Sequence, residues 1–206
     1  MQESRTILYN RRLMWTRYLM LSSLAAAGFA ASFPDYPIKR ITEYSTTVEN
    51  SGVVVAAVAV EDRKDQHQYF GMDLRTRGYI PVFLIVENRT PDGSVLLSRD
   101  SLTYGSGSTV PGAAKSSKSD KVVNAAAKIP SVYTIMWAIR ASKDKARRQH
   151  LLETELQSST LSPRTSVHGF IFVPAPRNYT SRKKIQLTIP FARSGSDDVV
   201  TIDLTL

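Results

Sequence analysis

The stretch Tyr79 to Glu87, YIPVFLIVE, is a continuous apolar run, and it decides the fold class. An earlier stretch, Gly52 to Val60 (GVVVAAVAV), has the same character. Both runs are short, rich in β-branched residues and followed by turn-forming or charged residues, which is typical of strands. Neither run has a polar face. We therefore expect both to be central strands of a sheet that is buried on two sides.

Further strand-like segments follow at Ser94 to Tyr104, Gly169 to Val173, Ile185 to Ile189 and Val199 to Leu206. The last two alternate apolar and polar residues, which predicts strands with one wet face. Short strands separated by Gly, Pro, Asn and Asp favour an antiparallel sandwich over an α/β fold, because an α/β fold needs a helix between successive strands.

Only one region, Asp120 to Gln157, has helical periodicity. Pro130 is a good first-turn residue for a helix. After it, apolar residues recur at helical spacing: Val132, Ile135, Met136 and Ile139. The preceding segment, Gly105 to Ser119, has the Gly- and Ser-rich composition of a flexible loop.

The sequence therefore predicts a mainly β protein, an antiparallel immunoglobulin-like sandwich with a helical insertion around 120–157. Residues 33–206 are expected to form a single domain, in which 105–157 are the flexible loop plus the insertion. No internal repeat is apparent.

Two segments carry a resemblance to a known class of proteins. Gly71 to Thr90 (GMDLRTRGYIPVFLIVENRT) has an apolar strand that ends in an acidic residue and an asparagine before a turn. Leu161 to Pro174 (LSPRTSVHGFIFVP) has a polar turn, a glycine and an apolar strand. These segments, a minority of the chain, resemble bacterial exported envelope proteins with immunoglobulin-like folds. The resemblance implies an exported β-sandwich and names no ligand.

The N-terminal residues 1–32 have the parts of a secretory signal peptide. Basic residues from Arg5 to Arg17 precede an uncharged apolar run, Tyr18 to Phe29, and small residues follow at 30–32. One alternative is a membrane anchor that is not cleaved, because the uncharged stretch is at the lower limit for a spanning helix. A buried hydrophobic helix is a third reading. The first two readings predict export to the periplasm or the outer envelope. The absence of cysteine excludes disulfides, thiolate metal sites and lipoprotein anchoring.

The net charge of +9 allows an anionic partner, either lipid or a polyanionic envelope surface. Basic residues are concentrated between Arg140 and Arg148, next to apolar residues of the expected helix. Such a segment could bind a partner, or it could pack on the sandwich with a solvated basic face. Nucleic acid is disfavoured, because no aromatic residues interleave with the basic ones. The hypothetical interaction surface consists of Trp137, Arg140, Lys143, Lys145, Arg147 and Arg148.

No motif for catalysis, cofactor binding or metal binding is present. His67 is expected in a polar loop, His150 in the basic helix and His168 at a strand start, so none is spaced to share a metal. Asp73 and Glu87 lie beside apolar residues and could serve as acids. The commoner role of such carboxylates is to close turns, and we favour that role here.

Two glycine-rich patterns are near misses. Gly105 to Thr109 resembles a nucleophile elbow but follows no strand-to-helix turn. Gly107 to Gly112 resembles a phosphate-binding loop, but Lys115 comes two residues too late to reach phosphates.

These observations predict a non-catalytic exported envelope protein that acts as a structural or interaction subunit of a larger cell-envelope assembly. It could also form an oligomer. One alternative is a periplasmic small-molecule or glycan-binding module with its pocket between the insertion and the sheet. Another is a hydrolase with dispersed catalytic residues.

Overall fold

The run at Tyr79 forms the longest strand of a four-stranded antiparallel sheet, sheet A. The computed structural model describes residues 33–106, 127–138, 144–175, 185–195 and 199–206, with only the backbone at 106, 137 and 138. Sheet A has the order β1-β2-β3-β8. Its strands are β1 (Thr46–Asn50), β2 (Val53–Ala59), β3 (Tyr79–Asn88) and β8 (Ser166–Pro174). The prediction that β2 and β3 are central strands is confirmed, since both lie between two neighbours and are buried over most of their length.

The second sheet, sheet B, is organised around β9 (Ile185–Arg193). On one side β9 pairs with β10 (Val199–Thr205) along nearly its whole length. On the other side it pairs with two short strands in succession, β4 (Val95–Leu97) and β5 (Thr103–Ser106). The short strands β7 (Ser159–Leu161) and β6 (Ala127–Lys128) extend the sheet next to β4 and β5, respectively.

One apolar core lies between the two sheets and another covers the outer face of sheet A. In the first core, alternate residues of β2 and β3 meet the inward residues of β9 and β10, including Leu187, Ile189 and Leu204. The prediction that β9 and β10 are strands with one wet face is therefore confirmed.

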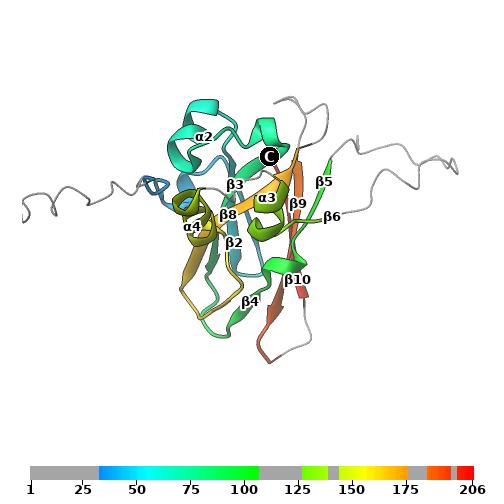
Figure 1. Cartoon of the computed structure of the whole chain (residues 1–206). Coiled ribbons are helices and arrows are strands. Elements are labelled where there is room, and N and C mark those ends of the chain that lie inside the picture. Colours follow the sequence, from blue (N-terminus) through cyan, green and yellow to red (C-terminus); the bar gives the residue numbers. More distant parts are fainter. Residues whose placement is uncertain (1–32, 107–126, 139–143, 176–184, 196–198) are drawn as a thin grey trace, which may run out of the picture. The chain divides into compact units, whose positions relative to one another are not determined.

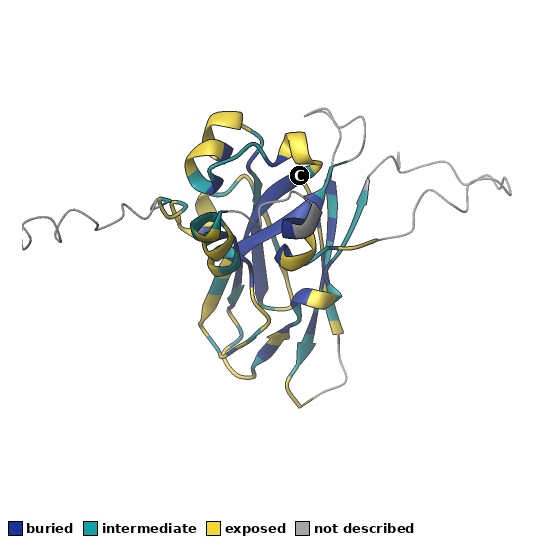
Figure 2. Ribbon diagram, viewed as in Figure 1, coloured by how far each residue is buried: buried dark blue, intermediate teal, exposed yellow. Residues whose placement is uncertain are grey.

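The second core packs sheet A against helices α2 (Arg63–Phe70), α3 (Val132–Ala138) and α4 (Lys145–Thr154). The residues thus form three layers, sheet B, sheet A and helices (Figures 1 and 2). The predicted β-sandwich with a helical insertion is confirmed.

The second core fills the space between helices and sheet where a ligand pocket was expected. Phe83, Phe170 and Tyr36 form close aromatic contacts there, with ring centroids 4.7 to 5.2 Å apart, and Phe70 packs edge-on against Phe170 at 4.9 Å. Burial raises the pKa of Tyr36 above its ordinary value of 10.0.

Helix α2 was not predicted, and His67 lies in it rather than in a polar loop. The helix buries only Gln66 and Phe70, so it has no apolar stripe that periodicity could detect. It forms because Asp62 caps its N-terminus and Gly71, at φ 66°, ends it in the left-handed conformation. Short 3-10 helices occur at Ile41–Glu43, Arg75–Arg77 and Arg99–Ser101.

The expected flexible loop begins later than predicted, because Gly105 and Ser106 belong to β5. Most of it, 107–126, lies outside the described residues, as do the leader at 1–32 and the glycine-rich near misses from Gly107 onward. Among the described residues, no helix is long and apolar enough to cross a membrane.

A buried ion pair fixes the helical insertion to sheet B. Arg99, in the 3-10 helix between β4 and β5, places Nη2 2.8 Å from Oε1 of Glu155, which directly follows α4. The same guanidinium donates to the carbonyls of Ile129 and Pro130, and Oε1 of Glu155 accepts from the amide of Val132 at 2.9 Å. Both side chains are nearly buried, at 9% and 7% exposure. The pair therefore joins the start of α3, the end of α4 and the β4–β5 connection.

The segment after α4 also lies in direct backbone contact with β8, through an isolated parallel bridge between Glu155 and Phe170. The amide of Leu156 donates to the carbonyl of Phe170 at 2.8 Å. A Cβ at Gly169 would lie 2.6 Å from the Cα of Leu156. Only glycine fits at this close approach, which explains the glycine at the start of the apolar strand.

Candidate functional site

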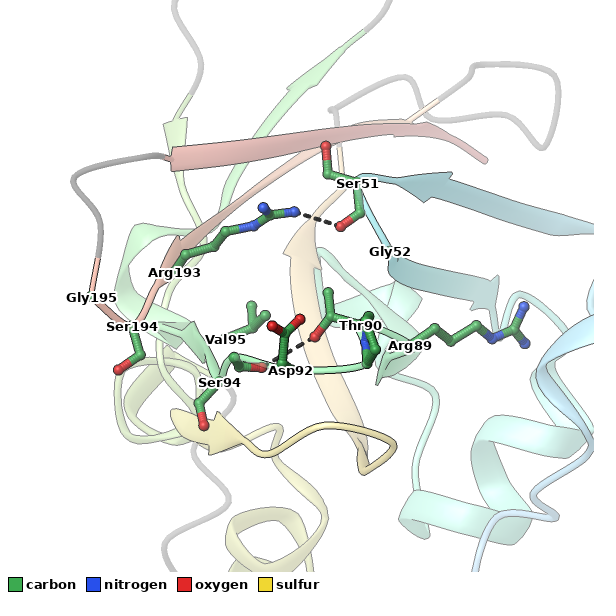
Figure 3. A pocket seen from close by; sticks show the side chains of 12 residues that line it. Ser51, Gly52, Arg89, Thr90, Asp92, Ser94, Val95, Arg193, Ser194 and Gly195 are labelled. Atoms are coloured by element: carbon green, nitrogen blue, oxygen red, sulfur yellow. Dashed lines mark hydrogen bonds between the residues drawn. The ribbon is translucent and has the colours of Figure 1, made fainter.

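An open pocket of about 540 Å³ lies where three chain reversals meet at one end of the two sheets. The reversals are the β1–β2 turn at Ser51-Gly52, the β3–β4 loop from Arg89 to Val95, and the end of β9 from Arg193 to Gly195 (Figure 3). They belong to both sheets, so the pocket lies across the end of the sandwich.

Each reversal contains a polar residue followed by a glycine with positive φ. Ser51 and Gly52 have φ of 53° and 78°, which suits the two-residue type I′ turn of a β-hairpin. Gly93 and Gly195 have φ of 85° and 84°. A Cβ at Gly52 would also lie 2.9 Å from Cγ2 of Thr90, so glycine is required there by both conformation and space.

Buried Asn88 holds the β3–β4 loop in place from below. Its Nδ2 donates to the carbonyls of Gly93 and Leu161 at 3.0 and 3.1 Å. Its Oδ1 accepts from the amide and hydroxyl of Thr90 at 3.0 and 2.6 Å. All side-chain functions of Asn88 are used, so the loop is rigid by construction.

Arg89 lines the pocket, but its charge is already paired. Its Nε and Nη2 donate to the two carboxylate oxygens of Glu87, each at 3.1 Å, and Nη1 lies 3.6 Å from Glu49. The hydrogen bond to Glu87 raises the pKa of Arg89. In Figure 3 its side chain points away from the other lining residues.

Arg193 and Asp92 are the charged groups that remain available in the pocket. The Nη2 of Arg193 donates to the carbonyl of Ser51 at 2.7 Å, which fixes the guanidinium across the gap between sheets. Its Nε is buried without a hydrogen-bond partner. Within the described part of the chain, neither Arg193 nor Asp92 forms an ion pair. Both side chains point toward the pocket (Figure 3).

The hypothetical basic surface is described only in part. Lys145 and Arg148 are exposed on α4, while Arg147 is half-buried. Trp137 lies in α3, and its side chain, like Arg140 and Lys143, falls outside the described residues. Whether these residues form one interaction surface stays a prediction.

Arg147 and His150 have a structural role, because both face α2. Arg147 pairs with Asp144 at 3.3 Å and lies close to Gly71, which ends α2. His150 Nε2 lies 2.7 Å from the carbonyl oxygen of Tyr69, and its ring lies tilted by 33° against the ring of Phe33, with centroids 4.9 Å apart. Asp144 caps α4, so the basic run does not continue as one helix through that residue.

The remaining candidate groups are occupied in local structure. Asp73 accepts from the amide of Thr76 at 3.1 Å, which confirms its turn-closing role, whereas Glu87 pairs with Arg89 instead. A second hollow of about 500 Å³ beside Asp73 is lined by Asp62, which already caps α2. The described residues contain no group of three potential metal ligands.

Sequence reasoning missed the end pocket, because its lining comes from three distant segments. The available signal was the three dipeptides Ser51-Gly52, Asp92-Gly93 and Ser194-Gly195, each typical of a tight turn. Comparison with protein-family models, curated proteins and solved structures finds no match for this chain. The resemblance to exported immunoglobulin-like proteins therefore stays a prediction.

Proposed function

We propose that this protein is an exported, non-catalytic interaction subunit of a larger cell-envelope assembly, and that it binds its partner at the end pocket. The observation that carries the proposal is the pair of unpaired charges, Arg193 and Asp92, directed into a pocket between rigid turns. The signal-like pattern of residues 1–32 supports the export part of the proposal.

The rigidity of the pocket favours binding. The network of Asn88 and the positive-φ turn at Ser51-Gly52 fix the lining before a partner arrives. A pre-organised site loses little conformational entropy on binding, so more of the contact energy contributes to affinity. Loops held on a rigid sheet scaffold are a common place for recognition.

The lining suits a polar protein segment that carries both kinds of charge. A carboxylate of the partner can pair with the guanidinium of Arg193, and a cationic group can pair with Asp92. The hydroxyl of Ser94 can donate or accept a hydrogen bond, whereas the hydroxyls of Ser51 and Thr90 already donate to Asn50 and Asn88 and can accept one. This arrangement fits electrostatic recognition of a folded partner.

A glycan or other small polar molecule is the second candidate for the same pocket. A volume of about 540 Å³ lies within the usual range for small-molecule sites. The hydroxyl-rich lining also matches the hydrogen-bonding capacity of a sugar. The hydrolase alternative gains no support from the lining, because Asp92 is the single carboxylate among the described residues that line the pocket.

Affinity purification from the native envelope tests the proposal. Wild type is compared with Arg193→Gln and with the matched control Arg77→Gln. Arg77 is exposed and precedes the opposite end of β3, about 30 Å from the pocket. Because hydrogen bonds to charged groups contribute about 1.5–3 kcal/mol, Arg193→Gln should weaken partner binding roughly tenfold to a hundredfold.

We expect wild type and Arg77→Gln to recover the same envelope proteins by mass spectrometry, and Arg193→Gln to lose them. Recovery of an identical set with all three proteins would contradict the proposal, as would wild type recovered without partners. In a parallel thermal-unfolding assay with envelope glycan fragments, stabilisation of wild type but not of Arg193→Gln would favour the glycan candidate instead.

A further inference from the structure

The face of sheet B that points away from the core, here called the outer face, has no helix over it among the described residues. Its members follow from strand register, because residues paired across antiparallel strands point to the same side. Along β9 and β10 they are Gln186, Thr188, Pro190, Ala192, Val199, Thr201, Asp203 and Thr205.

One row of the outer face is apolar in three of its four residues. Leu96 of β4 pairs with Ala192 of β9, which pairs in turn with Val199 of β10, and Thr160 of β7 completes the row beside Leu96. Leu96 and Val199 are 46% and 62% exposed, and they are two of the four large hydrophobic residues that stand out as exposed among the described residues. Exposed apolar residues that are contiguous across strands mark an interaction surface more strongly than scattered ones.

A second row carries opposite charges at its two ends. Lys128 of β6 pairs with Thr103, which pairs with Thr188, which pairs with Asp203 of β10. Lys128 and Asp203 are both exposed. With three inter-strand spacings between them, they lie about 14 Å apart.

We propose that the outer face binds a second copy of this chain, sheet against sheet, around a two-fold axis. The axis runs parallel to the strands and lies between β9 and its neighbours β4 and β5. It exchanges β6 with β10, and it exchanges β9 with β4 and β5. Lys128 of each copy then faces Asp203 of the other copy, and Leu96 faces Ala192. The contact is self-complementary, as a two-fold interface requires.

The physical dimensions allow this arrangement. Packed sheets lie about 10 Å apart with strands rotated by about 30°. At about 7 Å from the axis, that rotation displaces each charged pair by only a few ångströms, which the long lysine side chain can absorb.

The charges favour a second copy over an anionic surface. The chain carries a net charge of +9, so two copies repel one another over most orientations. Among the described strand residues of the outer face, one base, Lys128, balances one acid, Asp203, so two copies can meet there without net repulsion between these residues. The interface is distinct from the end pocket and does not depend on the function proposed for it.

Sedimentation velocity on the full-length chain tests the proposal with three variants. Lys128→Asp and Asp203→Lys each place like charges at both pair positions of the dimer, and each should raise the dimer Kd at least about tenfold. The control Lys64→Asp makes the same charge change on exposed α2, in the helical layer, and should leave the Kd unchanged.

Mixing the two monomeric variants gives the decisive measurement. In a two-fold dimer, one Lys128→Asp copy and one Asp203→Lys copy form two opposite-charge pairs, so the mixture should recover a heterodimer with near wild-type Kd. An effect of either substitution on folding alone cannot produce this recovery. A monomeric wild type, or a mixture that stays monomeric while wild type dimerises, would overturn the proposal.

Discussion

Replacing Glu155 with glutamine removes one charge of the buried pair with Arg99 and little else. The glutamine side chain keeps the shape of the glutamate, and its amide oxygen can still accept from the backbone amide of Val132. The guanidinium of Arg99 keeps its bonds to the carbonyls of Ile129 and Pro130 but loses its buried counter-charge. Its other carboxylate neighbour, Asp100, lies 3.5 Å away and is almost fully exposed.

The expected cost is about 3 kcal/mol in the free energy of unfolding. Breaking a buried ion pair by removing one partner typically costs about 3–5 kcal/mol, because a charge is left uncompensated. The lower end applies here, since two carbonyls still solvate the guanidinium. For a domain of this size, about 3 kcal/mol lowers Tm by roughly 6–12 °C.

Urea unfolding of wild type, Glu155→Gln, Arg99→Met and the double variant Arg99→Met/Glu155→Gln measures the effect. Since the double variant leaves no buried charge, it should be less destabilised than the sum of the single variants, and a double-mutant cycle gives the coupling. A Glu155→Gln variant within about 0.5 kcal/mol of wild type, or strictly additive effects, would refute the idea that the pair fixes the insertion.

Three further predictions concern single features. Gly169→Ala should lower the free energy of unfolding by about 1–3 kcal/mol, because its Cβ would lie 2.6 Å from the Cα of Leu156. Gly105→Ala is the control, since nothing lies within 4 Å of its Cβ. Equal unfolding midpoints for the two variants would contradict this close approach. The raised pKa of Tyr36 means that its contribution to the free energy of unfolding is fully present below pH 10 and is lost as pH rises above 10 toward the folded-state pKa. Tyr36→Phe should therefore reduce the fall of the free energy of unfolding with pH in this range. The same fall in both proteins would argue against burial of Tyr36 as its cause. Charge reversal of exposed Lys145 and Arg148 together should weaken binding to anionic vesicles at least about tenfold without lowering Tm, and unchanged vesicle binding would remove α4 as a basic interaction surface.

The central part of the fold could be predicted because its sequence is unambiguous. The runs at Gly52 and Tyr79 lack a polar face, and a strand without one must be covered on both sides. This requirement predicts that sheet A is covered on both faces, by one core on each side. Helix α2 could not be recognised in the same way, because Gln66 and Phe70 are its buried residues and tertiary contacts, not amphipathicity, hold it. Gln66 does so through bonds to Val60 and Leu74.

The end pocket could not be assembled from the sequence. Each turn dipeptide is readable alone, but nothing local tells which turns share an end of the sandwich. That information lies in the strand order of each sheet and in how the two sheets pack. Their packing brings the β1–β2 turn beside the end of β9, where Arg193 donates to the carbonyl of Ser51. The charges of Arg193 and Asp92 gain meaning only once this neighbourhood is known.

The double pairing of β9 has a consequence for the order of folding. Strands β4 and β5 are synthesised about ninety residues before the strand that pairs with both of them, whereas β1, β2 and β3 can form a sheet from local contacts. During synthesis the chain therefore carries two strands, β4 and β5, before their shared partner β9 exists. Strand β4 contains Leu96, which is exposed even in the folded protein. Such unpaired edges are the segments that aggregate during synthesis or transport. Because β9 follows both of its short partners in the chain, we expect sheet B to form after sheet A.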